Sequence, residues 1–157
     1  MLSITREKAL KFLKVADFKA KLFSKDNKRK VGAIILENDS LIQLSCGYNG
    51  LPRKLKETKK RWLKENKDLY VIHAETNAII QASRTNSNIN NSIMVCNRFP
   101  CHNCCLNIIQ VGIKLLITIE PDWNTLSEKW KKSFYASKEM LDELKIEIMF
   151  FKESDLL

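Results

Sequence analysis

The first part of the chain places apolar residues on one side of a helix and charged residues on the other. The apolar positions recur three and four residues apart, as in an amphipathic helix. They are Ala9, Leu10, Leu13, Ala16, Ala20 and Phe23. Ser3 is a suitable N-cap, because its hydroxyl can accept from a free backbone N–H of the first turn. We therefore predict a helix that begins near Ser3 and ends near Ser24.

Two runs of β-branched and apolar residues follow this helix, at residues 31–36 and 41–46. Four polar residues separate the runs, a pattern that predicts a β-hairpin. Beyond the hairpin the periodicity alternates between helix and strand. The expected helices cover residues 73–84, 100–111 and 127–144, and the expected strands cover residues 93–97, 115–120 and 146–151. This order predicts an α/β fold with a mixed five-stranded sheet and helices on both faces, hence three layers.

The sequence Gly47–Pro52 interrupts the second strand and leads into a lysine-rich insertion at residues 51–72. An insertion of this length is too long for a plain connection, so we expect it to be functional or poorly ordered. The chain has 157 residues, the length of one ordinary domain. We therefore predict a single domain over residues 1–157 that carries the insertion.

Charge is distributed unevenly along the chain. The formal net charge is +9, yet residues 1–72 hold 18 Lys or Arg against 8 Asp or Glu. Exposed lysines that keep the protein soluble would explain this excess. Attraction to phosphate would explain it equally well, in a nucleotide or in a nucleic acid. Charge alone does not choose between these explanations.

The chain shows no sign of a membrane or secretory protein. No window reaches the ~18 uninterrupted apolar residues of a membrane span, and the N-terminal region has no hydrophobic signal-peptide core. Three of the five cysteines lie within residues 101–105. Clustered cysteines of odd number in a reducing compartment indicate metal binding rather than disulfides. We expect a cytoplasmic protein without a membrane partner.

Cys101 and Cys104 are three residues apart, so a helix places both sulfurs on one face. Pro100 suits the first position of that helix, where a missing N–H costs nothing. The positive end of a helix stabilises thiolates, which bind metals. Cys105 and the intervening His102 face elsewhere on the helix, so we expect neither to bind the metal.

A catalytic zinc ion usually takes three protein ligands and leaves a fourth position to water. His73 supplies the third candidate, and Glu75 follows two residues later, within reach of that water. The arrangement His-x-Glu followed by Pro-Cys-x-x-Cys is the signature of zinc nucleobase deaminases, in which the glutamate is the general acid and base. A closed structural zinc site is the alternative.

Several further stretches carry a family resemblance. They are Ser24-Lys25-Asp26, residues 31–33, residues 47–53, residues 70–75, residues 77–79, residues 99–101 with Cys104, residues 108–110 and residues 112–114. Over nearly its whole length the chain resembles the deoxycytidylate deaminases of the cytidine-deaminase-like superfamily. The resemblance implies their three-layer fold and the zinc-dependent hydrolysis of dCMP to dUMP and ammonia, a supply of precursor for thymidylate synthesis.

The resemblance also implies roles for individual residues. Zinc would be held by His73, Cys101 and Cys104, and Glu75 would carry protons between water, the cytosine N3 and the leaving ammonia. Substrate contacts are implied for Asn49 and Ala74, with Ser24, Lys25 and Arg53 as candidate partners of the phosphate. Separately from the resemblance, Arg84 ends the predicted helix that follows His73, where it would either contact an effector or a neighbouring subunit or serve as a surface cap.

Members of this family form dimers or hexamers and respond to dCTP and dTTP with Mg²⁺, so a homo-oligomer and nucleotide effectors are implied here. No cysteine or histidine lies within residues 51–72, so one zinc site is expected. Three alternatives remain: a deaminase of tRNA or single-stranded DNA, a free-nucleoside deaminase, and a non-catalytic zinc module that binds nucleic acid. The motifs around Ser24 and Asn49 favour a mononucleotide without nucleic acid as partner.

Overall fold

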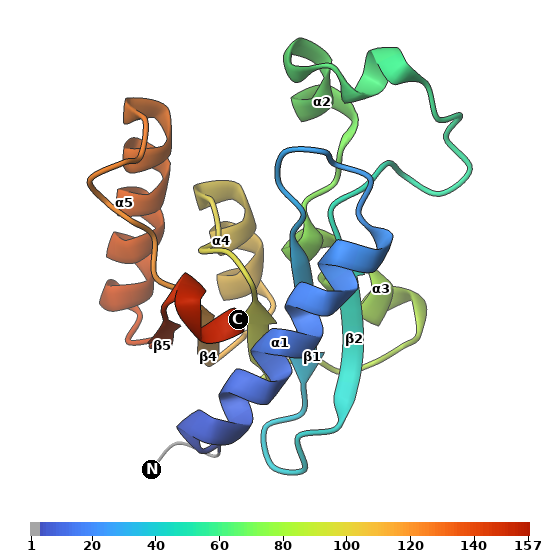
Figure 1. The fold of residues 1–157 in the computed structure, drawn as a ribbon. Coiled ribbons are helices and arrows are strands. Elements are labelled where there is room, and N and C mark those ends of the chain that lie inside the picture. The colour runs from blue at the N-terminus through green and yellow to red at the C-terminus, as the bar shows by residue number, and fades with distance from the viewer. Residues whose placement is uncertain (1–3) are drawn as a thin grey trace.

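The sheet at the centre of the computed structural model contains five strands and confirms the predicted mixed topology (Figure 1). The structure describes residues 4–157. The strand order is β2-β1-β3-β4-β5, in which β1 pairs antiparallel with β2 and β3, while β3, β4 and β5 run parallel. The strands are β1 (Gly32–Leu36), β2 (Gln43–Tyr48), β3 (Ile93–Cys96), β4 (Leu115–Ile119) and β5 (Glu147–Phe151).

Helices cover both faces of this sheet, which confirms the three layers (Figure 1). Side chains alternate along a strand, so Ile34 and Leu36 of β1 pack towards α1, whereas Ala33 and Ile35 pack towards α3 and α4. Among residues 4–157, no helix is long and apolar enough to cross a membrane. The helices are α1 (Arg6–Phe23), α2 (Lys64–Tyr70), α3 (Ala74–Arg84), α4 (His102–Gln110) and α5 (Glu128–Glu143).

Two helix starts differ from the prediction. Ser3 lies outside the described residues, and α1 begins at Arg6 with Thr5 as its N-cap, whose Oγ1 accepts from the Lys8 N–H at 3.3 Å. Helix α4 begins at His102, so Pro100 precedes the helix rather than opening it. The Pro100 carbonyl instead accepts a hydrogen bond from Ser137 of α5 at 3.0 Å.

The second part of the insertion at residues 51–72 is helical, with a 3₁₀ turn, Lys59–Trp62, and helix α2. The two ends of the insertion are joined, because Gly50 and Ile72 exchange backbone hydrogen bonds of 3.1 and 2.9 Å. Figure 1 shows it projecting from one end of the sheet, beyond α3 and β2. Its exit lies directly before His73, so the insertion is tied to the predicted site.

Candidate active site

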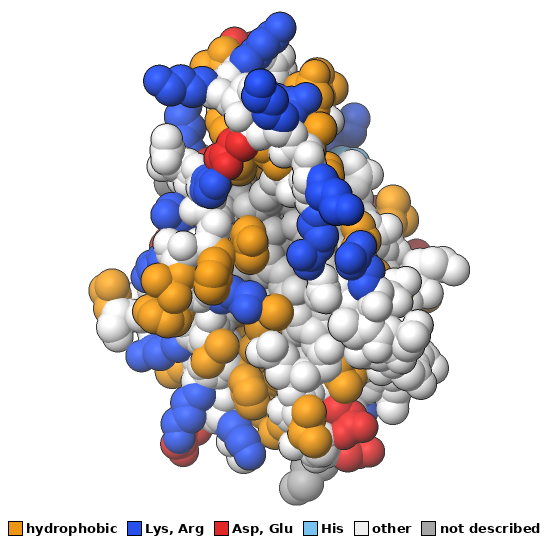
Figure 2. Space-filling model, turned by 90° about the vertical axis from the view of Figure 1, so that its right-hand side faces the viewer, with side chains coloured by type: hydrophobic (Ala, Val, Ile, Leu, Met, Phe, Trp, Pro, Cys, Tyr) orange, Lys and Arg blue, Asp and Glu red, His pale blue; other side chains and the backbone are white. Residues whose placement is uncertain are grey.

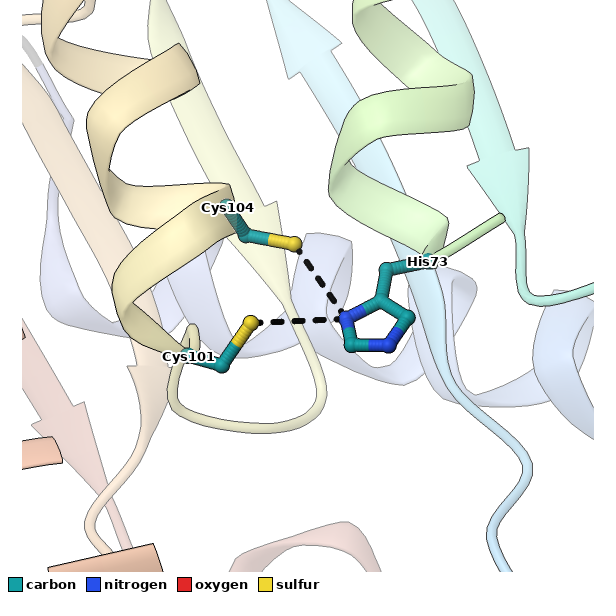
Figure 3. A group of neighbouring side chains, drawn as sticks. All are labelled: His73, Cys101 and Cys104. Carbon is teal, nitrogen blue, oxygen red and sulfur yellow. Dashed lines mark hydrogen bonds between the residues drawn. The ribbon is translucent and has the colours of Figure 1, made fainter. Parts of the chain in front are cut away.

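The N-termini of two helices bring the three predicted metal ligands together (Figure 3). His73 is the N-cap of α3, Cys101 is the N-cap of α4, and Cys104 lies in the first turn of α4. The Nδ1 atom of His73 lies 3.4 Å from the Sγ atom of each cysteine. The three ligand atoms all lie within 4.8 Å of one another, as a shared metal ion requires.

The charges of these groups also suit a metal. A hydrogen bond from Cys104 lowers the pKa of Cys101 to about 4, against the opposing effect of burial, and His73 contributes to the lowering. The hydrogen bond with Cys101, together with burial, raises the pKa of Cys104. The hydrogen bond with Cys101 raises the pKa of His73. Two sulfurs and one imidazole form a donor set that zinc prefers. The lowered pKa of Cys101 already favours its thiolate form.

Glu75 lies one helical position beyond Ala74 and is 4% exposed. Burial is the main cause that raises the pKa of this carboxyl, while the nearby His73 lowers it. Glu75 lines the same pocket as His73 and Cys101. A carboxyl that holds its proton more tightly than usual suits proton transfer near neutral pH.

Strand β2 lies very close to the first turn of α3, because Gly47 of β2 has no side chain at the point of contact. A Cβ atom built on Gly47 would lie 2.4 Å from the carbonyl oxygen of Ala74 and 2.5 Å from the backbone nitrogen of Ala78. Such distances are far inside van der Waals contact. The role of this glycine is therefore to allow the close approach of a strand to the helix that carries Glu75.

The pocket around these residues has a volume of about 600 Å³. Trp130 and Phe134 of α5 form part of its wall. Arg29 lies over the ring of Trp130, with its guanidinium carbon 5.1 Å from the ring centroid. Five cations border the pocket: Lys28, Arg29, Lys67, Arg98 and Lys152.

Asn49 lines the pocket, but its side-chain amide is already fully hydrogen-bonded to the protein. Its Oδ1 accepts from the Ser24 hydroxyl at 2.6 Å and from the Val31 N–H at 2.9 Å. Its Nδ2 donates to Asp26 at 3.3 Å and to the Arg29 carbonyl at 2.8 Å. In this arrangement Asn49 organises the loop of residues 24–31, and the hydroxyl of Ser24 is used within the same network.

The other predicted substrate residues do not all lie at this pocket. Ala74 is one of its lining residues. Lys25 forms an ion pair with Glu57 and lines a smaller pocket of about 190 Å³, while Arg53 donates to Gln81 at 2.6 Å. Neither cation lines the pocket that contains Glu75. Arg84 lies in the last turn of α3 and lines neither pocket.

Sequence reasoning missed Lys28, Arg29, Arg98 and Lys152 as residues of this pocket. Arg98 follows β3, and Lys152 follows β5. The carboxyl ends of parallel strands meet at one edge of a sheet, where ligands bind, so these positions carried a usable signal. Lys28 and Arg29 belong to the basic run around Lys25, but only the fold shows which members of that run face the pocket.

Two residues near the ligands have other partners, as expected. The Nδ1 atom of His102 lies 2.9 Å from the hydroxyl of Ser133. Cys105 is buried and lies against the Ser137 carbonyl, and burial raises the pKa of its thiol to about 11. Within residues 4–157, the group that can hold a metal is His73, Cys101 and Cys104.

Comparison with known proteins gives a consistent result. The family model described as the cytidine and deoxycytidylate deaminase zinc-binding region matches residues 6–120. A probable deoxycytidylate deaminase of Caenorhabditis elegans is 35% identical over 144 residues, which cover 89% of this chain and 68% of that protein. A probable deoxycytidylate deaminase of Drosophila melanogaster is 34% identical over 137 residues, covering 79% of this chain and 63% of that protein.

Two crystal structures of the dCMP deaminase from cyanophage S-TIM5 share the fold. The apo form has a TM-score of 0.72 and 25% identity, and covers 94% of this chain and 100% of that chain. The form in complex with dCMP and dUMP has a TM-score of 0.73 and 24% identity, and covers 94% of this chain and 99% of that chain. The likeness therefore extends beyond the zinc motif to the whole arrangement of the sheet and its helices.

Proposed function

The chain belongs to the family of cytidine and deoxycytidylate deaminases, and from this premise we propose that it hydrolyses dCMP to dUMP and ammonia. One observation carries the proposal: the buried carboxyl of Glu75 shares a pocket with a His-Cys-Cys group that fits zinc. The relatives named deoxycytidylate deaminase support dCMP as the substrate.

Zinc would be held by His73, Cys101 and Cys104, whose donor atoms lie within 4.8 Å of one another. When bound, the metal supplies a hydroxide at neutral pH by lowering the pKa of a coordinated water. Two cysteine sulfurs and a histidine nitrogen make the site selective for zinc over Mg²⁺ or Ca²⁺, which prefer oxygen ligands. The side of the site next to Glu75 opens into the pocket, where a cytosine can enter.

Glu75 is the proposed catalytic acid and base. Its carboxylate takes the proton of the attacking water and delivers it to N3 of the cytosine ring. Once the water oxygen has bonded to C4, the same carboxylate takes the remaining proton of the new hydroxyl and delivers it to the amino group. The C4–N bond then breaks, ammonia leaves and the ring carbonyl forms. Burial favours the protonated form of this carboxyl, which suits the delivery steps.

We place the 5′-phosphate near Lys28 and Arg29 at the edge of the pocket. Both border the pocket, and the guanidinium of Arg29 lies over the ring of Trp130, which lines the same pocket. Lys25 and Arg53, the candidates of the sequence motif, have protein partners outside this pocket. Comparing Arg29→Gln with Arg53→Gln decides between these placements: the variant that loses about tenfold or more in preference for dCMP over deoxycytidine identifies the phosphate contact.

We further propose how the protein assembles and how nucleotides regulate it. A homo-oligomer, either a dimer or a hexamer, and dCTP or dTTP as effectors with Mg²⁺ follow from family membership. The smaller pocket has properties that suit a nucleotide base and phosphate: Phe23 and Tyr48 stack with centroids 5.6 Å apart, and Lys25 borders it. Arg84 is proposed as a subunit or effector contact. We also propose a cytoplasmic location, a single deaminase domain over residues 1–157, and a role in thymidylate supply.

The decisive experiment measures ammonia release by zinc-loaded protein offered dCMP, deoxycytidine and a cytosine-containing single strand in parallel. We expect a clear preference for dCMP, and loss of turnover in Glu75→Gln with its zinc content unchanged. Activity on the strand without activity on dCMP would refute the proposal. The exposed basic residues of the insertion, visible at the top of Figure 2, would then be assigned to nucleic-acid binding.

A further inference from the structure

Polar side chains connect the insertion to the rest of the molecule at several places. Three of these contacts are exposed: Lys25 with Glu57, Lys129 with Asp68, and Arg53 with Gln81. Exposed pairs of this kind contribute little to stability, because water and salt screen them. They cannot by themselves fix where the insertion lies.

The contact between Lys67 and Asp26 differs from these. The Asp26 side chain is 3% exposed and that of Lys67 is 24% exposed, whereas both partners of the other ion pairs of the insertion are at least 44% exposed. Lys67 lies on α2, and Asp26 lies in the loop between α1 and β1. Both residues line the pocket of Glu75. A buried carboxylate that lost its cation would be unpaired in the protein, which is costly.

Asp26 joins this ion pair to the network of Asn49. One carboxylate oxygen accepts from the backbone N–H groups of Lys28 and Arg29 at 2.9 and 3.1 Å. The other accepts from Asn49 at 3.3 Å and from the ammonium group of Lys67. The carboxylate therefore fixes the backbone of the two residues that carry pocket cations, and Lys67 is the group that neutralises it.

We propose that Lys67 is a positioning residue for deamination, which acts through Asp26 to hold the loop of residues 24–31 and helix α2 as adjacent walls of the active-site pocket. The insertion is then a structural part of the pocket rather than a surface for nucleic acid. The ammonium group of Lys67 is used by Asp26, so it does not bind the phosphate directly. This inference rests on the proposed deamination.

The test compares Lys67→Met with Lys64→Met, because Lys64 is an exposed cation on the same helix. Both variants remove one positive charge from α2. For Lys67→Met we expect kcat/KM to fall on the order of 10- to 100-fold for dCMP and also, by a smaller factor, for deoxycytidine, because a misplaced wall affects both substrates and the same loop carries the proposed phosphate contacts Lys28 and Arg29. Lys64→Met is expected to behave as wild type. Lys67→Arg, which keeps the ion pair, should restore most of the activity.

A loss confined to dCMP, with hydrogen exchange of residues 24–31 unchanged, would overturn the proposal, since it would mean that Lys67 contacts the phosphate directly. Unchanged kcat/KM for both substrates would overturn it as well. Asp26→Asn combined with Lys67→Met provides a second criterion: the double variant should lose no more activity than the more affected single variant. Losses that multiply would show that the two residues act separately, and would contradict the inference.

A measurement without substrate separates this inference from the proposed reaction. Hydrogen exchange should increase in residues 24–31 and in residues 51–72 together in Lys67→Met, and in neither segment in Lys64→Met, at equal zinc content. If wild-type protein deaminated neither dCMP nor deoxycytidine, the proposed function would fail, and this pattern of exchange would still report whether Lys67 holds the two segments. Faster exchange in the insertion alone would overturn the positioning role.

Discussion

The metal-binding region and the lysine-rich insertion are built on different principles, although they meet at one pocket. The three metal ligands lie at the N-termini of α3 and α4, and these helices pack on the sheet through buried residues. The insertion of residues 51–72 is attached by a backbone bridge at its ends and by one largely buried ion pair. The proposed metal ligands and Glu75 therefore lie on helices that pack into the core. The insertion, which forms an outer wall of the pocket, is held by a few contacts that single substitutions can remove.

The largest effect is expected in the metal-binding region, from Glu75→Gln. This change keeps the shape of the side chain and removes its ability to carry a proton. Turnover should fall by about 10²- to 10⁴-fold, as for the loss of other general acids and bases. Steady-state kinetics with dCMP measures the loss, and zinc analysis serves as the control. A variant that kept more than a tenth of wild-type turnover would remove Glu75 from the mechanism.

Loss of a metal ligand should be nearly as damaging, but by another route. Cys104→Ser leaves two strong ligands, so we expect the zinc content and the activity to fall together. Cys105→Ser offers a matched control, because Cys105 is the next residue and lies against Ser137. Metal analysis of the two purified variants makes the comparison. Zinc retained at wild-type level in Cys104→Ser would contradict the proposed ligand set.

The difference between the two regions also explains what could be predicted from the sequence. The group of His73, Cys101 and Cys104 was predicted because the two cysteines share one face of a helix and His73 belongs to the same sequence signature, and the sheet was predicted from periodicity. Helix α2 was missed, because its sequence KENKDLY has no apolar stripe facing a core. The hydrogen bonds of Asn49 to Ser24 and Asp26 were missed as well, since they join residues more than 20 positions apart that only the fold brings together.

A third prediction concerns the close approach of β2 to α3. Gly47→Ala would place a methyl group within 2.4 Å of the Ala74 carbonyl, so the strand or the helix has to move. We expect a loss of about 1–3 kcal/mol in the free energy of unfolding, together with lower kcat, because Glu75 follows Ala74 directly. Urea denaturation and dCMP kinetics measure the two effects. Gly50→Ala is the control, since the nearest atom to its added Cβ lies 3.5 Å away.

A fourth prediction tests the ion pair between Lys67 of the insertion and Asp26 through its pH dependence. Burial raises the pKa of Asp26, but hydrogen bonds from Lys67 and from the N–H groups of Lys28 and Arg29 outweigh it, so the pKa is lowered in the folded protein. A carboxyl with a lowered folded-state pKa stabilises the fold at neutral pH, and this contribution is lost as the pH falls through that pKa.

Asp26→Asn should therefore be less stable than wild type at pH 7 by about 1–3 kcal/mol, the range for hydrogen bonds to a charged group. The difference should start to shrink as the pH falls below about 4, where Asp26 of the unfolded chain takes up a proton, and it should be lost below the lowered pKa of Asp26 in the folded protein. Urea denaturation of both proteins at neutral and acidic pH measures it. A difference that stayed constant with pH would mean that Asp26 acts through its shape and neutral hydrogen bonds, and the insertion would then be held by its backbone bridge rather than by charge.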